Sequence, residues 1–209
     1  KSWSTMAEAL HLRVETIPGD WRRALRPEAV EARLKEDKNA EIKGVLLIHT
    51  DTATGITSDI PAIRAAIDAA GHPALFLVDT VAALGTVDYR MDEWGIDVTV
   101  AASQKGMMMP PGLGIVAAGA KAVDVSRKAT MPRHYWDWKT RMEAAHYRKF
   151  CGTAPQLMVF GMREALDMLF EEGMETVFER HRVLAAATHA AVEVWGQAGA
   201  LYLNASEPK

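Results

Sequence analysis

Two polar side chains stand where apolar runs end, and together they could carry out amine chemistry. The apolar run at residues 96–102 leads into Ser-Gln-Lys105-Gly, and the run at residues 74–78 ends in Asp79. A lysine at the mouth of a buried strand is unusual, because removing an ammonium group from water costs free energy. A lysine amine can form an imine with an aldehyde, and a carboxylate can keep a ring nitrogen protonated. The pair therefore suggests carbonyl–amine chemistry.

Pyridoxal phosphate requires this combination of groups on neighbouring strands. Lys105 would form the Schiff base, and Asp79 would pair with the protonated pyridine nitrogen so that the ring withdraws electrons. The ordinary alternatives are a solvated loop lysine and a turn or N-cap aspartate. Residues 107–112 are mostly apolar, which predicts an apolar surround that lowers the pKa of Lys105 towards neutrality. We therefore favour the interpretation as a pyridoxal-phosphate enzyme.

Two further residues fit the same site. Val81, two residues after Asp79, would place an apolar side chain against the pyridine ring. Thr52 lies in the turn-like stretch at residues 49–55, where its hydroxyl would reach the substituents of the ring. Ordinary loop packing and a simple Ser/Thr turn are the alternatives for these two residues.

Alternating strand and helix signals must position these residues. Strands are expected at residues 44–49 (covered on both faces), 74–79, 96–102 and 113–117, with a short alternating strand at residues 12–17. Helices are expected at residues 1–10, from Pro27 through Leu34, and from Ser58 as N-cap to Gly71. Two long amphipathic helices, separated by Gly173, follow Pro155.

This order of elements predicts an α/β fold with a doubly wound, mostly parallel sheet. Ligands of such sheets bind beyond the carboxyl ends of the strands. Thr52, Asp79 and Lys105 all fall just past an expected strand end, so three independent strands point to one site.

Composition narrows the function classes. The 209 residues include 24 Lys and Arg against 27 Asp and Glu, for a net charge of −3, and no long run of one sign suggests a nucleic-acid or membrane-surface partner. No apolar stretch approaches the roughly 20 residues that cross a bilayer, and the polar residues within positions 1–10 lead us to expect a helix there and no signal peptide. Cys151 is the only cysteine, which favours the reducing cytoplasm and a buried, structural side chain. The seven histidines lack ligand spacing, so no metal is expected. The aromatic residues 135–138 are expected in the core or at a subunit interface.

On these residues the chain resembles the class V aminotransferases of fold type I, and among them the serine–glyoxylate and alanine–glyoxylate aminotransferases. The resemblance covers nearly the whole chain. The matching segments are HTDTATG (49–55), LVDTVAALG (77–85), DEWGIDV (92–98), SQKG (103–106), PPGL (110–113) and MPRHYWDW (131–138).

The resemblance implies six residues that bind pyridoxal phosphate, with Lys105 as the catalytic one. They are Lys105 (Schiff base), Asp79 (pyridine nitrogen), Val81 (ring stacking), Thr52 (ring oxygen), Gln104 (phosphate) and Thr153 (phosphate of the neighbouring subunit). The last role implies a homodimer. Phe150 stands where the family often has a tyrosine on the phosphate, and a phenyl ring cannot donate that hydrogen bond.

The implied activity is transamination from a small L-amino acid, with L-serine favoured, to glyoxylate. Alanine or aspartate as the amino donor stays open, and so does an inactive truncated product that acts only as a scaffold. A cysteine desulfurase is disfavoured, because Gln104 stands where those enzymes usually carry histidine.

The resemblance also implies a division into domains. Residues 1–172 are expected to form part of the cofactor-binding large domain, and residues 173–209 the start of a smaller C-terminal α/β domain. The Gly-rich phosphate loop and the aromatic residue over the other ring face would precede Lys1. The arginine that binds the substrate carboxylate would follow Lys209.

Overall fold

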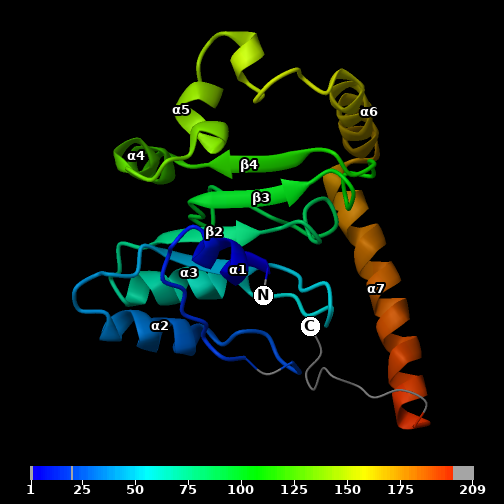
Figure 1. Cartoon of the computed structure of the whole chain (residues 1–209). Coiled ribbons are helices and arrows are strands. Elements are labelled where there is room, and N and C mark those ends of the chain that lie inside the picture. The colour runs from blue at the N-terminus through cyan, green and yellow to red at the C-terminus, as the bar shows by residue number, and fades with distance from the viewer. Residues whose placement is uncertain (1, 20, 200–209) are drawn as a thin grey trace.

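A four-stranded sheet forms the centre of the computed structural model, which describes residues 2–19 and 21–199 (Figure 1). The strands lie in the order β1-β2-β3-β4, where β1, β2 and β3 are parallel and β4 is antiparallel to β3. They are β1 (Gly44–Ile48), β2 (Leu75–Asp79), β3 (Val98–Ala102) and β4 (Gly114–Ala118). The predicted strands at these four places are confirmed.

Helices lie on both faces of this sheet, as expected for a doubly wound α/β fold. The helices α2 (Pro27–Glu36) and α3 (Ile60–Ala69) pack together on one face, where their apolar side chains meet those of the strands. The short helix α1 (Ser2–Ala9) lies in front of β2 in Figure 1. The main core consists of Val30, Leu34, Leu47, Ile60, Ile63, Ile67, Phe76, Val78 and Ile96.

The helix α3 shows how local sequence sets this packing. Its isoleucines at positions 60, 63 and 67 recur at helical spacing, so all three face the core and are buried. The Asp59 side chain, and not that of Ser58, is the N-cap, because its carboxylate accepts the Ala62 N–H at 2.9 Å. The Ser58 hydroxyl instead donates to the Ile48 carbonyl at 3.2 Å. The helix stops before Gly71, which adopts a φ of 62°.

Two further expectations about strands are wrong. Residues 12–17 are irregular and do not join the sheet; within them Glu15 pairs with Arg33 of α2. The strand β1 is covered on one face only. Leu47 is buried against α3, whereas Leu46 and Ile48 on the opposite face are 40% and 39% exposed.

The second half of the chain is mainly helical. After β4 come α4 (Ala120–Lys128), the short helices η1 (His134–Trp136), α5 (Trp138–Arg141) and η2 (His146–Arg148), and then α6 (Gln156–Glu172) and α7 (Met174–Gln197). The two long helices meet at Gly173, whose φ of 86° suits glycine, as the sequence predicts. A smaller core joins Leu169 of α6 and Val177 of α7 to Met107.

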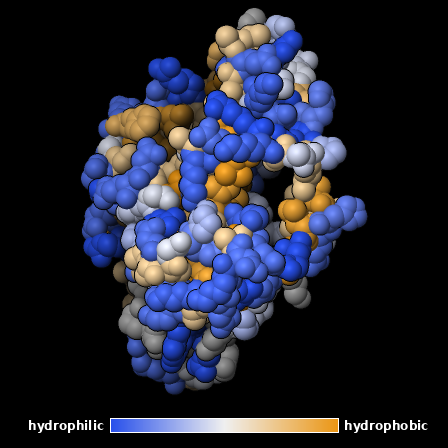
Figure 2. Space-filling view, turned by 90° about the vertical axis from the view of Figure 1, so that its left-hand side faces the viewer, coloured by the Kyte–Doolittle hydropathy of each residue, from blue (hydrophilic) through white to orange (hydrophobic). Residues whose placement is uncertain are grey.

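Surface exposure corrects two expectations. Cys151 is exposed, and Tyr135 and Trp136 are 59% and 67% exposed, so these aromatic side chains do not belong to the core of this chain. Their expected place at a subunit interface stays a prediction. The face at the α4 end is mostly hydrophilic, with hydrophobic patches between the charged side chains (Figure 2). Within residues 2–19 and 21–199, no helix is both long and apolar enough to cross a membrane.

Candidate active site at the carboxyl edge of the sheet

The strand ends bring three predicted site residues to one edge. The parallel register pairs Ile48 with Asp79 and Asp79 with Val100, so the carboxyl ends of β1, β2 and β3 lie side by side. Asp79 is the last residue of β2, Thr52 follows β1, and Lys105 follows β3. In Figure 1 this edge faces α7, because the arrowheads of β2 and β3 point towards it. The topology therefore supports the expected convergence.

The Asp79 carboxylate is held by hydrogen bonds to both of its oxygens. The Val81 backbone N–H donates to Oδ1 at 2.9 Å, and the Trp3 indole N–H donates to Oδ2 at 2.9 Å. Asp79 lies on the face of β2 opposite to Phe76 and Val78, so this bond places α1 on the face away from α3. Trp3 is a site residue that sequence reasoning missed, since no spacing connects two residues 76 positions apart.

The loop after β3 holds Lys105 through a buried serine. The Ser103 side chain is fully buried, and its hydroxyl donates to the Pro110 carbonyl at 2.8 Å and accepts the Leu113 N–H at 3.2 Å. The Ser103 N–H donates to the Leu113 carbonyl at 3.1 Å, which closes the base of the loop. Gln104 and Lys105 lie at the exposed tip. The serine preceding them was seen in sequence only as part of a motif, and its bridging role was missed.

Two glycines bring the Asp79 turn and the Lys105 loop into contact. A Cβ at Gly106 would lie 2.2 Å from the Leu84 carbonyl oxygen, and one at Gly85 would lie 2.7 Å from the Met107 methyl group. Gly85 also has a φ of 83°, which disfavours other residues. Because the backbones touch, the position of Lys105 relative to the turn after Asp79 is fixed.

The expected apolar surround of Lys105 is wrong for this chain. Lys105 is exposed, and so is Met108, at 52%. Met107 is buried, and it packs against Leu169 and Val177. The apolar residues after Lys105 therefore anchor the loop to α6 and α7 and do not enclose the amine.

Thr52 and Val81 lie on the turns that leave β1 and β2. The Asp51 carboxylate shapes the first turn by accepting hydrogen bonds from Ala53 N, Thr54 N and Thr54 Oγ1. These bonds, with those from Thr54 dominant, lower the pKa of Asp51, and they leave the Thr52 side chain exposed at the tip. Val81 is half-buried beside the Asp79 carboxylate.

Thr153 is not brought to this edge by its own chain. It is exposed in the segment before α6, and in the described part of the chain its side chain makes no hydrogen bond. The beginning of α6 nevertheless packs near the Lys105 loop, since a Cβ at Gly112 would lie 3.0 Å from the Met158 methyl group. Its predicted role across a subunit interface stays a prediction.

His49 is buried beside the candidate site, on the other face of the sheet. Its backbone N–H donates to the Asp79 carbonyl at 2.9 Å, while its ring lies 5.6 Å from that of Tyr89. The ring Nδ1 is buried without a hydrogen-bond partner among the described residues, and burial lowers the pKa of His49. Burial therefore favours the neutral form of the imidazole.

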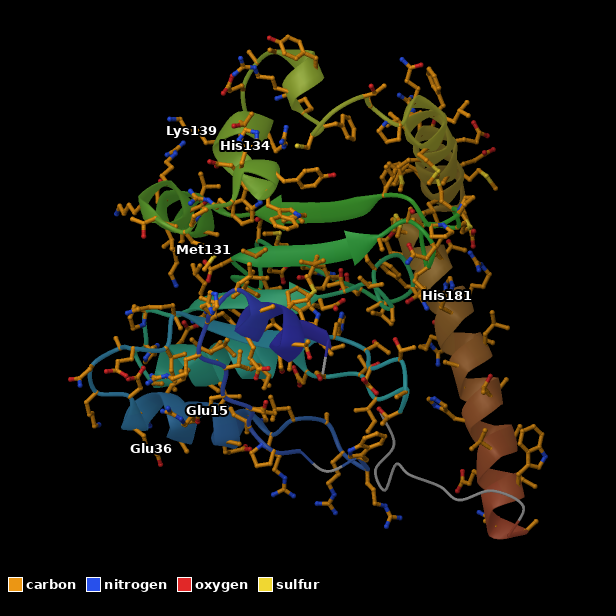
Figure 3. All side chains as sticks on the ribbon, viewed as in Figure 1. Glu15, Glu36, Met131, His134, Lys139 and His181 are labelled. Carbon is orange, nitrogen blue, oxygen red and sulfur yellow. The ribbon has the colours of Figure 1, made fainter. Side chains whose placement is uncertain are left out.

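A cavity of about 560 Å³ lies elsewhere, between α4 and α5. Its lining includes Arg133, Trp138 and Lys139. Figure 3 places Met131, His134 and Lys139 at this end of the sheet and His181 on α7 at the opposite end. The cavity is thus separate from the carboxyl edge.

The chemistry of the edge fits pyridoxal phosphate. Each Asp79 oxygen accepts one protein hydrogen bond and keeps a lone pair for a further N–H, such as that of a pyridinium ring. Lys105 offers an exposed primary amine to a carbonyl group, and Val81 an apolar surface next to the carboxylate. These three groups are positioned by contacts within the chain.

Known proteins are similar to this chain in sequence and in fold. A serine–glyoxylate aminotransferase of Methylorubrum extorquens is 44% identical over 199 residues, which cover 93% of this chain and 50% of the relative. An L-aspartate–glyoxylate aminotransferase of Paracoccus denitrificans is 40% identical over 194 residues, which cover 93% and 49%. The crystal structure of an alanine–glyoxylate aminotransferase from Nostoc sp. matches with a TM-score of 0.80 at 27% identity, over 92% of this chain and 50% of that one.

The chain spans about half the length of these relatives. Their shared fold confirms the predicted α/β architecture of the fold-type I enzymes. The family described as aminotransferase class-V matches residues 1–206. With fold and sequence in agreement over almost its whole length, the chain belongs to the class-V aminotransferases.

Proposed function

We propose that the protein containing this chain is a pyridoxal-phosphate-dependent aminotransferase that transfers the amino group of a small L-amino acid, L-serine in the first place, to glyoxylate. The observation that carries the proposal is the pair Asp79 and Lys105 on neighbouring parallel strands, with their loops in contact at Gly85 and Gly106. The names of these relatives differ in the amino donor, which is serine, aspartate or alanine, but all three include glyoxylate. This agreement supports glyoxylate as the acceptor more firmly than it supports any one donor.

Each residue has a defined task in this proposal. Pyridoxal phosphate, when bound, supplies a carbonyl group for amines and a protonated ring that withdraws electrons. The Lys105 amine would hold that carbonyl group and, once the amine of the substrate has displaced it, would be free to move the proton of the substrate α-carbon. Asp79 would hold the proton on the ring nitrogen, and Val81 would supply an apolar surface for the ring. Thr52 hydrogen-bonds the ring oxygen, and Gln104 the phosphate.

The finer features of the whole protein belong to the same proposal. We place it in the cytoplasm as a homodimer in which Thr153 reaches the phosphate of the partner subunit. The division at residues 172 and 173 is supported by the break between α6 and α7 at Gly173. The start of α7 still packs against Met107 through Val177. Residues 200–209 of the second unit lie outside the described part.

Reductive labelling tests the function. Borohydride reduction of the full-length protein with pyridoxal phosphate, followed by peptide mapping, should place the pyridoxyl label on Lys105. The variant Lys105→Ala should lose the label and transaminase activity, whereas the exposed control Lys128→Ala should keep both. Label on Lys121 or Lys128 would contradict the assignment.

The same full-length protein also tests which amino acid is the donor and whether the protein is instead an inactive scaffold. Turnover of glyoxylate with L-serine, L-alanine and L-aspartate should be fastest with L-serine. A faster rate with another donor would replace L-serine in the proposal. A full-length protein that binds no pyridoxal phosphate would favour the scaffold.

A further inference from the structure

The indole of Trp3 contacts the candidate site from a helix that none of the roles above uses. Its N–H donates to Asp79 Oδ2 at 2.9 Å, and both side chains are half-buried. An indole has one polar hydrogen and no acceptor, so this bond uses its whole hydrogen-bonding capacity. The contact joins α1 to the end of β2.

The bond from Trp3 restrains the orientation of the Asp79 carboxylate more than the Val81 N–H alone can. A carboxylate held at one oxygen can still turn about its side-chain torsions. A second donor on the other oxygen, from a different element, removes that freedom. Hydrogen bonds to a charged acceptor are short and stronger than neutral ones, so this pair fixes the plane of the carboxylate.

We propose that Trp3 is a positioning residue of the active site, whose indole N–H orients the Asp79 carboxylate towards the ring nitrogen of the cofactor. The inference rests on the proposed function. Without the indole, Asp79 would keep its charge but lose its fixed direction, and the contact with the ring nitrogen would weaken. Catalytic groups work best when surrounding contacts hold them in the productive geometry.

A pair of cofactor probes isolates this contact. We would measure the dissociation constants of pyridoxal phosphate and of its 1-deaza analogue, which has carbon in place of the ring nitrogen, for the full-length protein. Trp3→Phe should weaken the binding of pyridoxal phosphate about tenfold, as expected for the loss of support for a charge-assisted hydrogen bond. Binding of the deaza analogue should change less than twofold. Trp3→His, which keeps an N–H donor, should recover part of the loss.

The exposed Trp21, at 71%, provides a matched control. Trp21→Phe should leave both dissociation constants unchanged. Equal losses for the two probes in Trp3→Phe would show that Trp3 only packs, and equal behaviour of the two tryptophan variants would also overturn the proposal.

A second readout tests the contact without cofactor and does not require a Trp3 variant to fold. In the ¹⁵N-labelled apo protein, the indole N–H signal of Trp3 should move upfield when Asp79→Asn weakens the acceptor. The signal of Trp21 should stay in place. An unmoved Trp3 signal would refute the hydrogen bond itself. If the wild-type protein bound no pyridoxal phosphate, the proposed function would fail and the role of Trp3 with it, although this signal would still report the contact.

Discussion

At the scale of single residues, the backbones of His49 and Asp79 are hydrogen-bonded to each other, yet their side chains lie on opposite faces of the sheet in different environments. Strand alternation directs the His49 ring to the face of Leu47 and α3, where it is buried and neutral. The Asp79 carboxylate lies on the other face, where it accepts N–H groups from Trp3 and Val81. The sheet edge thus separates a neutral polar side chain from a hydrogen-bonded carboxylate across one layer of backbone.

The buried His49 predicts a loss of stability in mild acid. Its pKa in the folded protein is lowered below 6.5, so the unfolded chain binds a proton first as the pH falls. The free energy of unfolding should therefore fall below about pH 6.5, by at most about 1.4 kcal/mol per pH unit from this group, until the folded-state pKa is reached. Urea denaturation at pH 7.5 and pH 5.5 should show a smaller decrease for His49→Gln than for wild type. His134 is exposed, so His134→Gln should behave as wild type. An equal decrease in the free energy of unfolding between pH 7.5 and pH 5.5 for all three proteins would disprove the effect of His49.

At the scale of elements, the parts of the site that repeat a pattern were predictable and the parts that depend on distant contacts were not. The strands ending at Asp79 and Ala102 follow from their apolar runs, and the end of α3 from Gly71. The irregular course of residues 12–17 was missed because alternation of side chains does not show whether a neighbouring strand is available, and this segment has none in the sheet. The exposed state of Lys105 was also missed, since the composition of residues 107–112 does not show which way Met107 points.

The loop from Ser103 to Leu113 yields a prediction at this scale. Ser103→Ala removes the buried hydroxyl that bridges Pro110 and Leu113, so the Pro110 carbonyl and the Leu113 N–H each lose a partner. The variant should lose about 1–3 kcal/mol of unfolding free energy and bind pyridoxal phosphate more slowly, because the loop that carries Lys105 is no longer closed. Urea denaturation and the rate of cofactor loading measure the two effects. The control Thr130→Ala removes an exposed side chain and should match wild type, and an unaltered Ser103→Ala protein would show that the backbone alone closes the loop.

At the scale of the whole molecule, apolar surface gathers next to Thr153. At the start of α6, Leu157 is 87% exposed and Phe160 is 72% exposed. Contiguous exposed apolar side chains of this kind typically mark a surface that binds another protein. The position of Thr153 just before this helix therefore supports the proposed role at a subunit interface.

Complementation between two inactive chains tests that role. If Thr153 serves the partner's site, mixing Lys105→Ala with Thr153→Ala chains should produce heterodimers with one doubly altered site and one intact site. Activity should then rise well above that of either parent homodimer, towards a quarter of the wild-type value at random mixing of equal amounts. The formation of heterodimers without any gain in activity would assign Thr153 to its own subunit or to no site.

The backbone contact between Gly85 and Gly106 has a consequence for how such a sequence can evolve. A methyl group at position 106 would collide with the Leu84 carbonyl, which belongs to the turn that follows Asp79. A substitution that moves the backbone of the turn after Asp79 therefore requires a compensating change in the loop that carries Lys105, and the reverse also holds. Over long divergence, the segment with the carboxylate and the segment with the amine are expected to drift as one linked unit, although 26 positions separate Asp79 from Lys105 along the chain.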